Sequence, residues 1–162
     1  MMADGIEFSI TGVDSLLDKL DAVSVDLRRK GGRAALRRAG NVIVERAKTN
    51  ARRVDDPGTG RSIADNIAMR WNSRLFKQTG DLSFRIGVLH GAVLKKHPDL
   101  GKNAPTPHWR LIEFGTENVR AQPIMRPAVE SSAGEVINTF VTEYERAIDR
   151  AIKRAQKKGT PP

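Results

Sequence analysis

The sequence predicts one α+β domain in which a small antiparallel sheet packs against two N-terminal helices and one long C-terminal helix. Three observations predict this class: apolar residues at helical spacing near the N-terminus, two strand-like segments in the middle, and a sustained helical stripe near the C-terminus. A chain of 162 residues is long enough to bury a core. We therefore expect a single domain over residues 1–158 and a flexible tail over 159–162.

The N-terminal third predicts a short strand and two helices. Residues 6–10 alternate loosely between apolar and polar side chains. Residues 14–29 begin with an Asp suited to capping and continue with apolar residues at helical spacing. Gly31 and Gly32 predict a break, after which a longer amphipathic helix over 35–54 carries basic residues on its polar face.

The middle of the chain predicts an antiparallel pair of strands. Residues 62–67 follow a turn-rich loop and are expected to form one or two helical turns. Strands are predicted over 68–76 and 82–89, joined by a hairpin turn over 77–81. Apolar and polar residues alternate in the second strand, so one of its faces should be buried. Residues 90–107 lack periodicity and predict a long exposed loop.

Residues 112–127 read IEFGTENVRAQPIMRP and predict a stiff connector that leads into the last helix. Ile112 and Phe114 alternate with Glu113, as in a short strand that packs one side on the core, so Phe114 is expected to be buried. Gly115 is suited to a turn, and two nearby prolines restrict the chain. Residues 128–155 then carry a helical apolar stripe, which predicts a helix of about seven turns.

Several kinds of chemical site are disfavoured. The chain contains no cysteine, which excludes disulfides and thiolate metal ligands. Residues 58–62 resemble a phosphate-binding loop but lack its Lys and its glycine spacing. The three histidines, His90, His97 and His108, are spaced too widely to place two metal ligands on one helix face.

The acidic residues near the connector also lack catalytic partners. Glu113, Glu117 and Glu130 have no nucleophile or base at a diagnostic spacing. No apolar run approaches the roughly 20 residues that span a bilayer, and the N-terminus has no signal-like core. We therefore expect no enzymatic activity, no cofactor, no metal and no membrane contact.

Positive charge is concentrated in two windows of the sequence. The chain has a formal net charge of +9, and Arg28–Arg53 alone holds ten basic residues against one acid, while Arg146–Lys158 holds six against one. Two interpretations stay open: the cations solvate outer helix faces, or they meet DNA or an acidic protein. The candidate partner-facing or DNA-facing residues are Arg37, Arg38, Lys48, Arg52, Arg53, Arg120, Arg126, Arg150, Lys153, Arg154 and Lys157.

The segment from Trp109 to Ala128 resembles the signature "EFGT … A-x-P-F-x-R-P-A" of minor tail or tail-completion proteins of lambdoid siphophages, a tailed-phage neck family. Weaker similarities precede it: VDSLLDKL at 13–20, VIVERAKTNA at 42–51 and TGRSI at 59–63. Ile124 stands where the family usually has Phe. The motif residues are Trp109, Glu113, Phe114, Gly115, Thr116, Pro123, Arg126 and Pro127.

The resemblance implies a structural virion protein of the phage neck rather than an enzyme. Such a tail-completion protein or head–tail connector joins the head portal complex to the tail, and it is assembled in the bacterial host cytoplasm. The implied partners are head-closure, tail-terminator or tail-tube rings, other copies in a hexameric ring by analogy, and, nonspecifically, genomic DNA. A tail terminator, a head-closure protein and a nonspecific DNA-binding protein are the alternatives. The connector is interpreted as architectural or as touching a neighbouring subunit.

Overall fold

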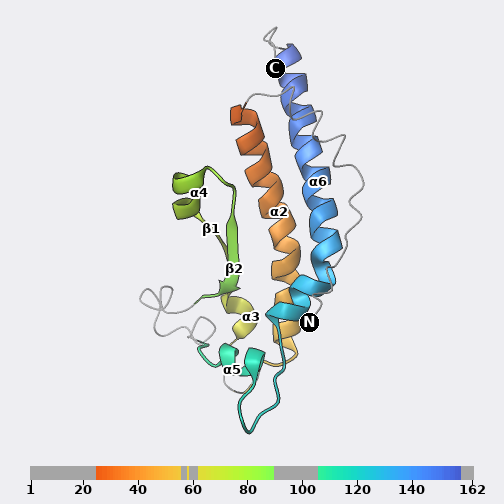
Figure 1. The fold of residues 1–162 in the computed structure, drawn as a ribbon. Helices are drawn as coiled ribbons and strands as arrows, with labels where there is room; N and C mark the ends of the chain where they lie inside the picture. The colour runs from red at the N-terminus through yellow and green to blue at the C-terminus, as the bar shows by residue number, and fades with distance from the viewer. Residues whose placement is uncertain (1–24, 56–57, 59–61, 90–105, 158–162) are drawn as a thin grey trace, which may run out of the picture. The chain divides into compact units, whose positions relative to one another are not determined.

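Figure 1 shows the computed structural model of the chain, and the residues it describes are 25–55, 58, 62–89 and 106–157. The chain divides into two compact units. Unit 1 contains the chain up to Ala39 and from Gly134 onward, and unit 2 is Gly40–Ala133. The predicted strand over 6–10, residues 14–24 of the predicted helix over 14–29, residues 90–105 of the predicted loop over 90–107 and the predicted tail over 159–162 lie outside the described residues.

The predicted α+β class is confirmed. The described elements are a helix on the N-terminal side, four further helices and one two-stranded antiparallel sheet, and the last helix is the longest. No helix among the described residues is both long enough and apolar enough to cross a membrane.

Helix α2, Val25–Arg52, is continuous through Gly31 and Gly32. The predicted break at these glycines was wrong. Glycine in a helix costs about 1 kcal/mol relative to alanine, but Gly31 lies where space is short in unit 1. A Cβ atom placed on Gly31 would lie 3.2 Å from Cβ of Ala147 and 3.3 Å from the ring of Tyr144. Close packing against another helix therefore accounts for a glycine within α2.

Helix α6, Met125–Lys157, confirms the long C-terminal helix. Within unit 1, α2 and α6 pack side by side (Figure 1) through a cluster of buried residues: Ala35, Val141, Tyr144 and Ile148. The Tyr144 hydroxyl donates to the backbone carbonyl of Arg28 at 2.8 Å. Burial raises the pKa of Tyr144 and Arg28 partly opposes that rise, so this buried phenol stays neutral and bonded.

Unit 2 is built around a second cluster of buried apolar residues. Side chains from the second half of α2, from the middle of the chain and from the start of α6 meet there. The buried members are Val44, Ala47, Ala51, Ile63, Ala64, Ile67, Ile124 and Ala128. Small alanines on α2 let neighbouring elements approach its backbone closely.

Helix α3, Ile63–Asn66, confirms the helical turns predicted over 62–67. Its N-terminus is capped from outside, because the Asp55 carboxylate accepts from the backbone N–H groups of Ile63 at 2.8 Å and Ala64 at 3.2 Å. The Ser62 hydroxyl also donates to Asp55, at 3.2 Å. The carboxylate thus closes the turn-rich loop that follows α2.

The sheet consists of β1, Ile67–Trp71, and β2, Phe84–Val88, paired antiparallel with Ile67 opposite Val88. Ile86 and Val88 pack against the core of unit 2, whereas Arg85, which precedes Ile86, is exposed. The alternation predicted for the second strand is therefore confirmed at these positions.

The first strand is shorter than predicted. It ends at Trp71, and α4, Ser73–Thr79, replaces both its predicted second half and the hairpin turn. Asn72 caps α4 by accepting from the Leu75 N–H at 3.3 Å, and Gly80, with φ of 78°, ends it. These two caps stabilise a helix in a segment whose apolar residues had favoured a strand.

Candidate functional site

The signature segment begins with a helix where the sequence predicted a strand. Helix α5 is Trp109–Phe114. Glu113 is only 2% exposed, whereas Phe114 is 66% exposed, so the core position predicted for Phe114 was wrong. Helical spacing explains why Glu113 is buried and Phe114 is exposed. Trp109 and Ile112 pack against the core of unit 2 and share their face with Glu113, while Leu111 and Phe114 share the outward face.

The Glu113 carboxylate caps the N-terminus of α6. Its Oε2 atom accepts from the backbone N–H groups of Ile124 at 2.6 Å and Met125 at 2.9 Å, and Oε1 accepts from that of Arg126 at 3.1 Å. The next residue is Pro127, which has no N–H to donate. The first four backbone N–H groups of a helix have no acceptor within the helix. In α6 the Glu113 carboxylate accepts from three of these positions, and the fourth is a proline, which has no N–H group.

Arg126, in the first turn of α6, bonds back to Glu113 on α5. We call these contacts between Glu113 and residues 124–126 the α5–α6 joint. Its Nε atom donates to Oε1 of Glu113 at 3.3 Å, and a terminal guanidinium nitrogen donates to the Glu113 carbonyl at 2.9 Å. The guanidinium also lies 5.4 Å from the centroid of the Phe114 ring. Arg126 was predicted to face a partner; its side chain is 57% exposed, yet it also holds α5 to α6. An exchange to Glu would therefore disturb the contact between α5 and α6 as well as any partner contact.

The balance of forces on Glu113 keeps its carboxylate charged. Burial raises the pKa of Glu113, but the backbone N–H groups of Met125, Ile124 and Arg126, with the Arg126 side chain, together lower it below the ordinary value of 4.5. Hydrogen bonds to the charged form outweigh desolvation here. The positive end of the α6 dipole acts in the same direction.

The lowered pKa of Glu113 predicts a loss of stability in acid. Its contribution to the free energy of unfolding is complete above the ordinary value of 4.5 and is lost as the pH falls below it, because the unfolded chain binds the proton first. Urea midpoints measured from pH 7 to pH 3 should fall more steeply for the natural chain than for Glu113→Gln. Parallel curves for the two proteins would contradict this role for the carboxylate.

The loop that joins α5 to α6 folds back on Gly115. The Thr116 N–H donates to the carbonyl of Val119 at 2.9 Å, and the Thr116 hydroxyl accepts from the Val119 N–H at 3.0 Å. The Gln122 N–H donates to the Ile112 carbonyl at 2.8 Å, which returns the chain to α5. The predicted turn at Gly115 is confirmed.

The exposure of Phe114 predicts a small effect of truncation on stability. Phe114→Ala should change the free energy of unfolding by less than about 1 kcal/mol, as expected at a surface position that loses one cation–π contact. Buried Ile124, which is 1% exposed, provides the comparison, because Ile124→Ala should cost about 2–5 kcal/mol. Chemical denaturation of both variants distinguishes the two positions, and equal losses would place Phe114 in the core after all.

The basic candidates belong to both units. Arg37, Arg38, Arg150, Lys153, Arg154 and Lys157 belong to unit 1, whereas Lys48, Arg52, Arg53, Arg120 and Arg126 belong to unit 2. All are exposed except Lys48, which is half-buried. In unit 1, Glu143 pairs with both Arg38 and Arg146. Some of the positive charge is therefore neutralised within the chain.

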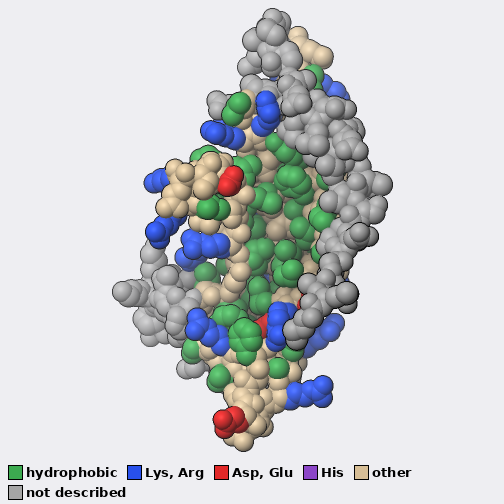
Figure 2. Space-filling view, in the orientation of Figure 1, with side chains coloured by type: hydrophobic (Ala, Val, Ile, Leu, Met, Phe, Trp, Pro, Cys, Tyr) green, Lys and Arg blue, Asp and Glu red, His purple; other side chains and the backbone are tan. Residues whose placement is uncertain are grey.

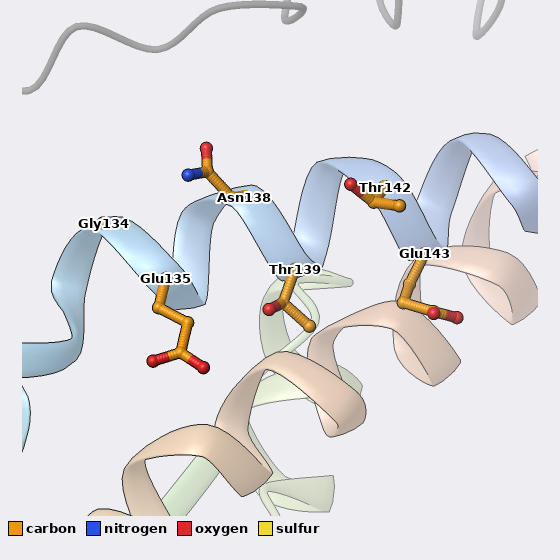
Figure 3. A pocket seen from close by; sticks show the side chains of 6 residues that line it. All are labelled: Gly134, Glu135, Asn138, Thr139, Thr142 and Glu143. Carbon is orange, nitrogen blue, oxygen red and sulfur yellow. The ribbon is translucent and has the colours of Figure 1, made fainter.

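Two shallow hollows lie along α6 in unit 1. One is lined by Gly134, Glu135, Asn138, Thr139, Thr142 and Glu143, and Figure 3 shows that all six come from this one helix. The other is lined by Arg38, Glu143, Arg146, Asp149, Arg150 and Lys153. Neither combines a nucleophile, a base and an orienting group in hydrogen-bond contact. Among the described residues no three His, Cys, Asp or Glu side chains come together to hold a metal ion.

The geometry defines an α+β protein in which a buried, fully hydrogen-bonded carboxylate joins two helices, α5 and α6. A family described as "Bacteriophage HK97-gp10, putative tail-component" matches residues 14–115. No curated protein and no solved structure matches the chain. Because the match covers well over half of the residues, the chain belongs to this family of phage tail components. The phage resemblance seen in the sequence is thereby confirmed.

Proposed function

We propose that the chain is a structural protein of the virion neck, a tail-completion protein or head–tail connector that joins the head portal complex to the tail around the DNA channel. The observation that carries the proposal is membership of a phage tail-component family over residues 14–115. The contacts of Glu113 with the start of α6 and with Arg126 support the proposal, because these polar groups fix two helices against each other. The role is assembly and not catalysis.

A ring of copies is the arrangement we propose, by analogy with the sixfold symmetry of tails. Closed rings are built from heterologous contacts that repeat from one subunit to the next. Neighbouring head-closure, tail-terminator or tail-tube rings are the proposed partners, and the virion is the proposed location after assembly in the host cytoplasm.

The test is the place of the protein in the particle. A phage with a stop codon in this gene should yield filled heads and separate tails that do not join, and the purified protein should restore joining. A reconstruction of the complete virion should show the chain between portal and tail tube. Density at the tail tip, or normal particles from the mutant phage, would contradict the neck role; density in the terminator or head-closure ring would favour those alternatives.

Nonspecific DNA binding is the second candidate, and the exposed cations of α6 favour it. Arg146, Arg150, Lys153 and Lys157 recur at intervals of three or four residues and so follow one face of the helix. All four are exposed. A straight row of cations gains affinity for a polyphosphate backbone by releasing counterions.

Duplex binding should therefore depend steeply on salt. We expect micromolar affinity for a random duplex at low salt and a loss of at least about tenfold as salt rises from 50 to 200 mM. Lys153→Gln with Lys157→Gln should reduce the slope of log affinity against log salt, whereas Lys77→Gln, on exposed α4 of unit 2, serves as the control. Absence of binding at 0.1 M salt would reject this function.

A further inference from the structure

Exposed large apolar side chains are concentrated in the signature segment. Leu111, Phe114, Val119 and Val129 are between 48% and 66% exposed. Only Val25, in unit 1, joins them among the large apolar residues exposed in the described part of the chain. Single exposed apolar residues are ordinary, but four within nineteen positions are not. We call these four side chains the apolar patch.

Helical spacing and one cation–π contact relate Leu111, Phe114 and Val129 of the apolar patch. Leu111 and Phe114 are three residues apart on α5 and share a face. The Arg126 guanidinium lies over the Phe114 ring, and Val129 lies one turn further along α6 on the same side as Arg126. In the space-filling view, apolar side chains lie beside Arg or Lys side chains over the α5 end of unit 2 (Figure 2).

The backbone beneath the apolar patch is held by many bonds. Val119 is fixed by its two hydrogen bonds with Thr116, and its carbonyl lies 3.0 Å from the position of a Cβ on Gly115. The α5–α6 joint is fixed by the buried Glu113 carboxylate. A surface that is already ordered loses little conformational entropy on binding, so its apolar area can contribute to affinity.

Arginines surround the apolar patch. Arg110 lies four residues before Phe114 on α5, Arg120 follows Val119, and Arg126 covers the Phe114 ring; all three are exposed. The exposed acids of the segment are Glu117 and Glu130, one fewer than its exposed arginines, one of which, Arg126, also pairs with buried Glu113. The whole chain carries +9, which favours an acidic partner at this surface.

We propose that the apolar patch is a docking surface for a different protein whose contact region presents apolar side chains flanked by carboxylates. Phe114 and Leu111 enter its apolar centre, and Arg110, Arg120 and Arg126 pair with its acids. This inference rests on the proposed role in assembly, because it names the surface through which the chain engages the particle. Aromatic and arginine side chains are the residues that dominate such interfaces.

The first experiment measures binding of the purified protein to heads and tails from the phage with the stop codon. Leu111→Ser with Phe114→Ser should weaken binding by about tenfold or more, while the melting temperature stays close to that of the natural chain. Val25→Ser, a change at the exposed apolar residue outside the patch, should bind normally. If the natural chain itself does not bind, the proposed function fails; if it binds and the double variant binds equally well, only the docking surface fails.

The second experiment identifies the occupant. Phe114 is replaced by the photoreactive analogue p-benzoylphenylalanine, and the protein is irradiated in the joined particle. Cross-links to another protein at a segment with apolar residues beside Asp or Glu are the expected result. Cross-links to a second copy of this chain or to a basic segment would overturn the proposal, and so would their absence.

Discussion

Glu113→Ala is expected to lower the free energy of unfolding by about 3–5 kcal/mol, the largest effect of any single change at the joint. The variant removes the acceptor for three backbone N–H groups at the start of α6. It also leaves the Arg126 guanidinium without its carboxylate partner. Because the site is buried, water replaces these bonds poorly.

Two variants make this measurement specific to the joint. Glu117→Ala, at an exposed acid of the adjoining loop, should change stability by less than about 0.5 kcal/mol. Glu113→Gln keeps one acceptor oxygen and should lie between the two. Urea denaturation of all three variants supplies the comparison. If Glu113→Ala lowers the free energy of unfolding no more than Glu117→Ala does, Glu113 does not stabilise the start of α6.

Gly115→Ala is expected to cost about 2–4 kcal/mol. Gly115 has φ of 76° and ψ of −179°, a combination that is adopted almost only by glycine and costs other residues about 1–3 kcal/mol. A Cβ there would also lie 2.8 Å from the Ala121 backbone nitrogen, and a backbone atom cannot move aside as a flexible side chain can.

Gly134→Ala is the matched control because it predicts the opposite sign. Gly134 is exposed in α6, and a Cβ there meets no atom within 4 Å. Alanine should therefore stabilise the helix by about 0.5–1 kcal/mol. Thermal unfolding of the two variants should show a lower midpoint for Gly115→Ala and a higher one for Gly134→Ala. A neutral Gly115→Ala would mean that the loop relaxes without cost.

Glu113 and Gly115 show how EFGT and PxxRPA work together in this chain. The Glu of the first part accepts hydrogen bonds from the backbone that begins the second part, and the Arg of the second part returns to the Glu. The Gly allows the chain to fold back between them. The two halves of the motif are therefore one structural unit, and its outward face carries the apolar patch.

Local patterns predicted the elements whose signal is long or has a distinctive period. The apolar stripe of α6 extends over many turns, and β2 alternates strictly through Phe84, Ile86 and Val88, so both were predicted correctly. Residues 73–79 and 109–114 offered only a few apolar positions, for which periods of 2.0 and 3.6 residues are hard to distinguish. Residues 73–76 and 112–114 were predicted to be extended, and both segments lie in helices.

Packing also explains why a glycine at position 31 lies within a helix. The helix cost of Gly31 is visible in the sequence, but Tyr144 and Ala147, the neighbours that leave little room for a side chain there, are more than a hundred residues away. No local rule connects such distant positions. The same separation hid the bond between the Tyr144 hydroxyl and the Arg28 carbonyl.

The sequence by itself determined the α+β class, the absence of cysteine chemistry, the two basic windows, the long C-terminal helix and the phage resemblance, because each depends on composition or on local pattern. Only the tertiary structure decided that Glu113 points inward and Phe114 outward. The physical reason is that a buried carboxylate needs hydrogen-bond donors, and the donors to Glu113 are the backbone N–H groups of Ile124, Met125 and Arg126. These groups reach Glu113 only after the chain has folded back at Gly115.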